Sequence, residues 1–350
     1  MTSVAEEYAY VVGVDTHAKT HTYTIVETRT GQTMITDTFP TSEAGLSRAL
    51  TWVSRHTTSE PLMVVEGIGS YGAILTERAQ QVGFLVVEPD RMPAGAKRGK
   101  GKSDELDAGR IARSVLASDV TRLRKPRADQ GPRDALQVLI AARKTRNIIR
   151  TAMINALTAL VRRTPLGVDA RRQLTDAQIR TISGWKTRNE ALHLATARQE
   201  AVYLAHHIMG LTKELVVNKS TIDYLIRSTQ YKQLLDEPGV GPICAAKIII
   251  AYGNHDRIHS EASFAALAGV CPIPASSGNT SRHRLNRGGD RQLNSAIHTI
   301  VLTRLAHDPE TKAYQERRLQ EGKTPREIRR CLKRYIVRDL YRLLRRLSGE

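Results

Sequence analysis

Cysteine is scarce in this sequence. The 350 residues contain three cysteines, Cys244, Cys271 and Cys331, and none of them forms a Cys-x-x-Cys spacing. This odd number of cysteines and their spacing indicate neither a disulfide framework nor a zinc knuckle. Long apolar runs are also missing, because no segment approaches the ~18 residues of a membrane span, and the N-terminal MTSVAEEY lacks the charge and apolar core of a signal peptide. We therefore expect a cytoplasmic protein with no membrane partner.

Aromatic residues make up only 5% of the chain, which argues against a protein built on base-stacking platforms. Positive charge is in excess, with 53 Lys and Arg against 35 Asp and Glu and a net charge of +18. A polyanion is the natural partner of such a chain, and we expect nucleic acid to be held mainly through its phosphates. The hydrophobic content of 41% is ample for two or three domains of roughly 150 residues each.

Residues 8–125 are predicted to form an α/β domain. Three β-rich runs, YAYVVGVD, HTYTIVE and TMITDTF, are separated by turn-prone segments and predict a meander of three strands. An amphipathic stretch from Thr41 to His56, the strand LMVVE, a helix from about Ser70, the strand FLVVE and a helix from about Ser103 follow. This order of elements resembles the ribonuclease-H-like fold of RuvC-type nucleases.

The rest of the chain is predicted to be mainly helical. After the linker RKPRADQGPRD, long helical patterns at 133–163 and 187–228 predict an antiparallel coiled-coil hairpin within residues 126–230, which could join subunits. A compact helical bundle is the alternative. Residues 231–350 are expected to form a mainly α C-terminal domain that ends in a basic amphipathic helix.

Four acidic residues stand at positions that suit metal-dependent chemistry. Asp15 ends the first predicted strand and Glu66 ends LMVVE, while Asp104 and Asp107 are three residues apart and share one helix face. Four such carboxylates can hold two Mg²⁺ ions ~4 Å apart on the attacking and leaving oxygens of a phosphodiester. Each acid alone is as easily an exposed charge or a helix cap; together they have the layout of RuvC-like nucleases.

Several basic residues precede this acidic helix. The run AGAKRGKGKSDELD contains Lys97, Arg98, Lys100 and Lys102, which can guide a nucleic-acid backbone to the acids or form only a solvated loop. By contrast, His255, Asp256 and His259 in HDRIH only resemble half of a zinc-protease motif. We expect a loop there, because the motif requires a helix and a glutamate.

A glycine-rich turn begins the C-terminal domain. In LDEPGVGPICAAKIIIAYG, Gly239 and Gly241 permit close backbone approach, and the free N–H groups of the following helix can bind a phosphate. The pattern matches the helix-hairpin-helix of sequence-independent DNA binders. The alternative is a turn that joins two helices without a ligand.

The segment LAGVCPIPASSGNTSRHRLNRGGDRQLN places two serines beside several arginines. Together with the four acids, the glycine-rich turn and the closing AHDPETKAYQERRLQEGKTPREI, it resembles the DEDD transposases of the IS110 insertion-sequence family over nearly the whole chain. The resemblance implies a RuvC-like domain and a C-terminal serine transposase domain joined across a coiled coil. It also implies that the serine before glycine, Ser277, is the nucleophile, although Ser276 stays open as an alternative.

The resemblance has further implications. A serine that attacks a phosphodiester forms a phosphoserine bond, which keeps the reaction reversible for strand exchange. We expect carboxylate-bound Mg²⁺ to activate Ser277, and Arg282, Arg284 or Arg287 to stabilise the developing charge; His283 is a possible proton carrier. The family implies donor and target double-stranded DNA, a guide (bridge) RNA encoded by the element, and a homodimer or homotetramer.

Two other functions fit parts of the sequence. A RuvC-like endonuclease would hydrolyse branched DNA with the four carboxylates and use the C-terminal part only for binding. A non-catalytic nucleic-acid-binding protein would need none of the four acids. A covalent protein–DNA adduct separates the leading function from the endonuclease, and substitution of the acids by amides separates both from the binding protein.

Overall fold

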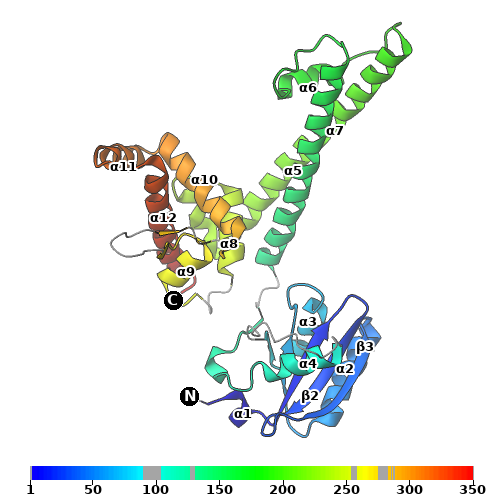
Figure 1. Ribbon diagram of the computed structural model, residues 1–350, viewed down its shortest axis with the longest axis vertical. Helices are drawn as coiled ribbons and strands as arrows, with labels where there is room; N and C mark the ends of the chain where they lie inside the picture. Colours follow the sequence, from blue (N-terminus) through cyan, green and yellow to red (C-terminus); the bar gives the residue numbers. More distant parts are fainter. Residues whose placement is uncertain are drawn as a thin grey trace. The chain divides into compact units, whose positions relative to one another are not determined.

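Residues 2–89, 104–126, 131–253, 258–274, 283–284, 286 and 288–349 are described by a computed structural model of the chain. The chain divides into two units, Met1–Ala128 and Asp129–Glu350. The first unit is an α/β domain with one mixed β-sheet, and the second is mostly helical (Figure 1). These two features of the predicted fold are confirmed. The finer division into domains at 8–125, 126–230 and 231–350 stays a prediction.

One five-stranded sheet organises the first unit, with the strand order β3-β2-β1-β4-β5. The strands are β1 (Tyr10–Thr16), β2 (Thr20–Glu27), β3 (Thr33–Pro40), β4 (Leu62–Val65) and β5 (Val86–Val87). The first three strands pair antiparallel, as the predicted meander requires, whereas β4 pairs parallel to β1 and β5 parallel to β4. The fifth strand is shorter than FLVVE predicts.

The alternation of residues along β1 sends side chains to two different cores. Val12 and Val14 pack in a cluster with α2 (Glu43–His56) and α3 (Ala73–Gln81). Val11, on the opposite face, joins a cluster with α4 (Asp104–Arg113). The short elements α1 (Val4–Glu7) and η1 (Val120–Arg122) complete the unit, and Val4 and Val120 pack at this second cluster. The residues of β1 with odd numbers therefore face α4.

Two long helices dominate the start of the second unit, α5 (Pro132–Arg163) and α7 (Leu192–Arg227) (Figure 1). They run antiparallel, because Asn218 donates a hydrogen bond to the carbonyl of Leu139 at 3.1 Å while Arg150 donates to Thr212 at 2.7 Å. The two predicted long helices, at 133–163 and 187–228, are confirmed, although the second begins at Leu192 and not at 187. A coiled coil and a role in joining subunits stay predictions. The connection also contains α6 (Asp176–Ser183), which the sequence analysis did not predict.

The remaining helices enclose the main apolar core of the second unit. These elements are η2 (Gln230–Asp236), α8 (Pro242–Tyr252), α9 (Glu261–Leu267), α10 (Arg291–His307), α11 (Pro309–Gln320) and α12 (Pro325–Leu347), with the short strands β6 (Ile273–Pro274) and β7 (His283–Arg284). The nearly all-apolar α8 lies in this core, together with the start of α5 and the end of α7. Among the helices of the described residues, none has the length and apolar character needed to cross a membrane.

Candidate metal centre

The candidate site begins with the close contact between β1 and α4. A β-carbon on Gly13 would lie 2.1 Å from the carbonyl oxygen of Ala108 and 2.5 Å from the nitrogen of Ala112, both in the α4 backbone. Only glycine leaves room for the helix at this distance. Asp15 is two residues further along the same strand, so it belongs to the same face, beside the beginning of α4.

The helix supplies two carboxylates to this region. Ala108, Ile111 and Ala112 form its buried face, and Asp104 and Asp107 continue that face into the first turn. The negative charges also suit the helix N-terminus, where backbone N–H groups have no partners within the helix. Asp107 accepts a hydrogen bond from Arg110 at 3.2 Å, which holds its side chain on the helix surface.

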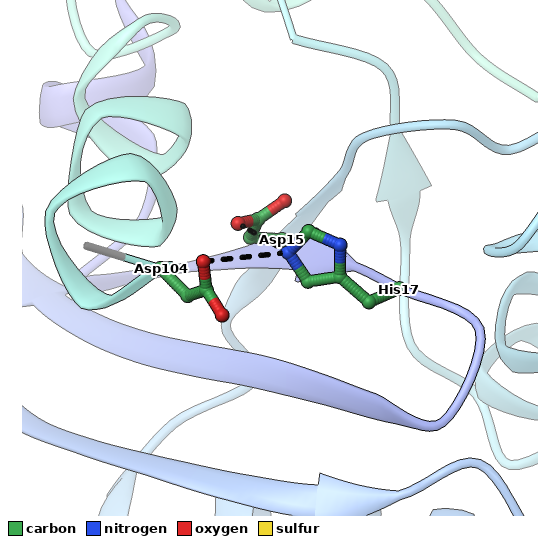
Figure 2. A group of neighbouring side chains, drawn as sticks. All are labelled: Asp15, His17 and Asp104. Carbon is green, nitrogen blue, oxygen red and sulfur yellow. Dashed lines mark hydrogen bonds and ion pairs between the residues drawn. The ribbon is translucent and has the colours of Figure 1, made fainter. Parts of the chain in front are cut away.

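His17 connects the two carboxylates that lie closest together. Its Nε2 atom is 3.2 Å from Oδ2 of Asp15 and 3.5 Å from Oδ1 of Asp104 (Figure 2). The side chain of Asp15 is only 11% exposed, while those of His17 and Asp104 are 47% and 58% exposed. The site is therefore closed at the sheet and open toward Asp104.

The surroundings of Asp15 disfavour its charged form. Burial raises the pKa of the Asp15 carboxyl, and the nearby charges of Asp104 and Asp107 raise it further, while His17 acts in the opposite direction. A carboxylate that is both desolvated and close to other carboxylates is stabilised by a bound cation. Carboxyls whose pKa is shifted by burial and by neighbouring charges are typical of functional sites.

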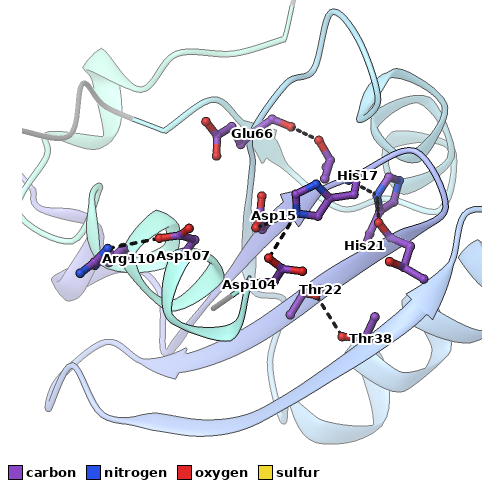
Figure 3. A network of polar contacts seen from close by, with 11 residues as sticks. Asp15, His17, His21, Thr22, Thr38, Glu66, Asp104, Asp107 and Arg110 are labelled. Atoms are coloured by element: carbon purple, nitrogen blue, oxygen red, sulfur yellow. Dashed lines mark hydrogen bonds and ion pairs between the residues drawn. The ribbon is translucent and has the colours of Figure 1, made fainter. Parts of the chain in front are cut away.

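Glu66 adjoins the site through the backbone. The parallel pairing of Val14 with Val65 continues in a hydrogen bond from the Glu66 N–H to the Val14 carbonyl at 3.1 Å, and Thr16 donates to the Glu66 carbonyl at 2.9 Å. Glu66 thus lies beside Asp15, with an exposed side chain. Figure 3 shows Asp15 in one view with Glu66 from the end of β4 and with Asp104 and Asp107 from α4.

The residues present fit a divalent metal ion. Asp15, His17 and Asp104 each offer a ligand atom, and these atoms lie within 4.8 Å of one another. Carboxylate oxygens are the ligands that Mg²⁺ and Ca²⁺ take in proteins, and the buried Asp15 would gain a compensating charge. Of the four predicted acids, Asp15 and Asp104 belong to this group, and Glu66 and Asp107 lie near it (Figure 3). Their roles as metal ligands and catalytic residues stay predictions.

His17 is the residue that the sequence analysis missed. The signal was present, because a two-residue period places Asp15 and His17 on one face of an extended strand. The analysis weighed the turn-prone segment THAKT only as a connection between strands. The structure shows that His17, in the turn directly after β1, brings its imidazole within reach of both carboxylates.

Much of the predicted cationic and serine site lies outside the described residues. This applies to Ser276, Ser277, Lys97, Arg98, Lys100, Lys102, Arg282 and Arg287, and to His255 and Asp256 of the HDRIH motif. For His283 and Arg284 the structure describes only the backbone, in β7. The roles proposed for these residues stay predictions.

The described residues on either side of the serine segment form a tight frame. Strands β6 and β7 pair antiparallel, so both ends of segment 275–282 belong to one small sheet. Gly289 packs so closely that a β-carbon on it would lie 2.5 Å from the nitrogen of Gly269. Asn294 donates to the Ala268 carbonyl at 2.7 Å, and Lys333 donates to the Asn294 side-chain oxygen at 3.2 Å. The turn after α9 is thus tied to the start of α10 and, through Lys333, to α12.

The glycine-rich turn joins η2 to α8. Gly239 has a positive φ of 77°, which favours glycine, and Gly241 is the N-cap residue of α8. Arg304 of α10 donates to the Pro238 carbonyl at 2.7 Å, so the turn is also a packing contact. The assignment of Gly239 and Gly241 to DNA binding stays a prediction.

Comparisons with known proteins agree with this arrangement. Residues 12–165, which include all four acids, match a family of IS110-type DEDD proteins described as Transposase. Residues 231–316, which include the glycine-rich turn and the serine segment, match the Transposase IS116/IS110/IS902 family. The two matches together cover more than half of the chain.

Two relatives come from insertion elements. The chain is 26% identical over 322 residues to an uncharacterized 42 kDa protein of insertion element IS900 from Mycobacterium paratuberculosis, and the match covers 78% of this chain and 79% of that protein. It is 33% identical over 114 residues to an uncharacterized 43.6 kDa protein of insertion element IS110 from Streptomyces coelicolor, covering 32% of this chain and 28% of that protein. With the acidic site at one sheet edge and both family matches in chain order, the chain belongs to the IS116/IS110/IS902 family of transposases.

Proposed function

We propose that this transposase cuts and rejoins DNA through a covalent bond between Ser277 and a backbone phosphate, assisted by a Mg²⁺-binding site at Asp15, Glu66, Asp104 and Asp107. The observation that carries the proposal is the approach of Asp15 and Asp104 to one another at the edge of the sheet, with His17 between them. A nearly buried carboxyl beside other acids is unfavourable for folding, and burial and these acids both raise the pKa of Asp15. A cation and a phosphodiester substrate give a reason to keep these acids together.

The bonds exchanged in the proposed reaction balance without any further reactant. The Ser277 oxygen attacks phosphorus, its proton passes to a base, and the bond from phosphorus to one sugar oxygen breaks. The sugar oxygen leaves with a proton, and the phosphodiester now links serine to DNA. Attack by a sugar hydroxyl of another strand reverses these changes and releases the serine. When bound, Mg²⁺ would neutralise charge on the phosphodiester oxygens.

The chain's own residues have separate tasks in this scheme. Asp15 is fixed by the sheet at the end of β1, and its carboxylate would face the bound ion. The exposed Asp104 and Glu66 are accessible to the substrate. Arg282, Arg284 and Arg287 follow the serine in sequence and would stabilise the pentavalent phosphorus by their positive charges.

The finer parts of the proposal rest on the sequence resemblance, with support from the fold. The strand order β3-β2-β1-β4-β5 supports a ribonuclease-H-like (RuvC-like) first domain. The antiparallel α5 and α7 support a coiled-coil hairpin that joins two or four subunits, and the turn before α8 supports a helix-hairpin-helix. The guide RNA rests on the resemblance alone, and the net charge of +18 is compatible with it.

A trapping experiment tests the proposal. The protein is incubated with Mg²⁺, the non-coding RNA of its element and labelled donor and target DNA, and is then denatured. We expect labelled DNA attached to the wild-type protein and to Ser276→Ala, and no attached DNA with Ser277→Ala or Asp15→Asn. Ser277→Ala should retain nucleic-acid affinity, because a neutral hydroxyl adds little to electrostatic binding.

Other results would assign the function differently. Cleaved DNA without an adduct in any variant would support hydrolysis by the carboxylates, as in an endonuclease. An adduct that survives in Ser277→Ala but disappears in Ser276→Ala would move the nucleophile by one residue. Full activity of Asp15→Asn would remove the metal site from the proposal.

A further inference from the structure

His17 is the one member of the Asp15–His17–Asp104 group that the four-acid pattern does not contain. Its Nε2 atom lies between oxygens of the two aspartates, at 3.2 Å from one and 3.5 Å from the other (Figure 2). The three side chains come from the end of β1, from the turn after it and from the first turn of α4. Two elements and a turn therefore aim one nitrogen and two oxygens at the same small volume.

The spacing of these atoms is that of ligands around one ion. An octahedral ion with ligands at about 2.1 Å separates neighbouring ligand atoms by about 3.0 Å. The distances of 3.2 Å and 3.5 Å measured from His17 Nε2 are close to this value. Small side-chain rotations would thus suffice to bring Nε2 and both oxygens to a common ion.

The backbone that carries His17 is fixed. Its N–H donates to the Thr20 carbonyl at 3.1 Å, which closes the turn between β1 and β2. The preceding residue, Thr16, pairs with His21 across the same hairpin, and His21 is 2% exposed. The imidazole therefore extends from a hydrogen-bonded hairpin, and little conformational freedom would be lost when it binds an ion.

We propose that His17 coordinates the divalent ion through Nε2, together with Asp15 and Asp104, and that this nitrogen raises the affinity of the site for transition-metal ions relative to Mg²⁺. Imidazole nitrogen is a good ligand for first-row transition ions, whereas Mg²⁺ takes oxygen and keeps several waters. The inference rests on the metal site of the proposed function. It adds to that site a ligand and a metal preference that four carboxylates alone would not have.

The alternative role for His17 is an ion pair. A protonated imidazole between two carboxylates would have the same geometry and would be displaced when an ion binds. The two roles differ only in whether a metal–nitrogen bond forms. Activity cannot distinguish them, because either role can affect the reaction.

Mn²⁺ binding to the full-length protein distinguishes them. Electron paramagnetic resonance of free Mn²⁺ gives the affinity, and the electron spin echo of bound Mn²⁺ detects a directly coordinated imidazole nitrogen. We expect a nitrogen signal in the wild type that His17→Gln removes, with Mn²⁺ affinity reduced about tenfold or more. Mg²⁺ affinity, measured by competition, should change less. His193→Gln, an exposed histidine of α7, is the matched control and should equal the wild type.

Each other outcome has a definite meaning. If the nitrogen signal persists in His17→Gln, another histidine is the ligand and the inference is wrong. If Mn²⁺ binds equally well to wild type and His17→Gln without a nitrogen signal, and Asp15→Asn abolishes binding, His17 is only an ion-pair partner and the carboxylate site stands. If the wild type binds no Mn²⁺, the inference fails together with the metal site, while serine-adduct formation is still tested separately by the trapping experiment.

Discussion

Asp15 is an acidic residue in a position where its charged form is disfavoured. Its side chain is nearly buried at the end of a central strand, and burial is the main cause of its raised pKa. The packing of β1 against α4 is made by Val11 and Gly13 on the same face. It does not depend on an acid at position 15. Asp15 thus combines a cost in stability with a gain in ion binding, as active-site residues commonly do.

We predict that Asp15→Asn stabilises the metal-free protein. Because the folded pKa is raised, the folded state holds the proton more tightly than the unfolded state. The stabilising effect of protonation is therefore present at low pH and is lost as pH rises from the ordinary value of 3.8 through the raised value. At pH 7 the neutral amide should therefore raise the unfolding midpoint of the first unit.

Thermal unfolding with a chelator, at pH 7 and again near pH 4, measures this effect. The difference between Asp15→Asn and wild type should shrink at the lower pH, because the raised pKa of Asp15 favours the neutral carboxyl in the folded state as the pH falls. Added Mg²⁺ or Mn²⁺ should stabilise only the wild type. A lower midpoint for Asp15→Asn at pH 7 would mean that the hydrogen bond with His17 outweighs the burial of charge.

At the scale of elements, the distance between α4 and β1 determines where Asp104 and Asp107 lie relative to Asp15. We predict that Gly13→Ala disrupts this arrangement, because the added carbon would overlap the backbone of α4 at Ala108 and Ala112. The helix must shift, at a cost of about 1–3 kcal/mol typical of overpacking, and Asp104 and Asp107 move with it. Unfolding measurements should show the loss of stability, and Mn²⁺ titration a weaker site. Gly69→Ala is the control, since a β-carbon there meets nothing within 4 Å; equal loss in both variants would contradict the prediction.

The elements that could be predicted from the sequence are those with a clear periodicity or an end signal. The three-strand meander, the long α5 and α7, and α12 with its capping box at Thr324 all have such signals. The short α6 was missed although Thr175 and Gln178 form a capping box, because only Ile179 and Ile182 mark its apolar face. Its stability comes from packing against residues of α5 and α7 such as Leu157 and Ala201, which lie too far along the chain for a local pattern to include.

The site was predictable in part for the same reason. Local geometry gave the strand-end positions of Asp15 and Glu66 and the shared helix face of Asp104 and Asp107. That the four acids converge was a prediction from the RuvC-like layout. The contact of His17 with Asp104 joins residues 87 positions apart and depends on how closely α4 approaches β1. That distance is set by Gly13, whose role becomes evident only once the helix and strand are packed together.

At the scale of the whole molecule, positive charge remains after the described ion pairs are counted. The last helix, α12, presents Arg342, Arg345 and Arg346 at its exposed face, and within the described part of the chain no carboxylate pairs with them. By contrast, Arg227 of α7 is held by Asp223 at 2.8 Å. Because transposases act on DNA, unpaired arginines on one helix face are candidates for phosphate contacts.

We predict that Arg342→Gln combined with Arg346→Gln weakens binding to DNA of any sequence. Each lost phosphate contact should reduce the slope of log affinity against log salt concentration by about 0.9, so the double variant should show a slope smaller by nearly two. Fluorescence anisotropy with random-sequence duplexes across a salt series measures it. Arg227→Gln is the matched control, because its charge is already paired. A slope unchanged in the double variant would show that α12 faces away from DNA, and the excess charge would then have to act through other parts of the chain.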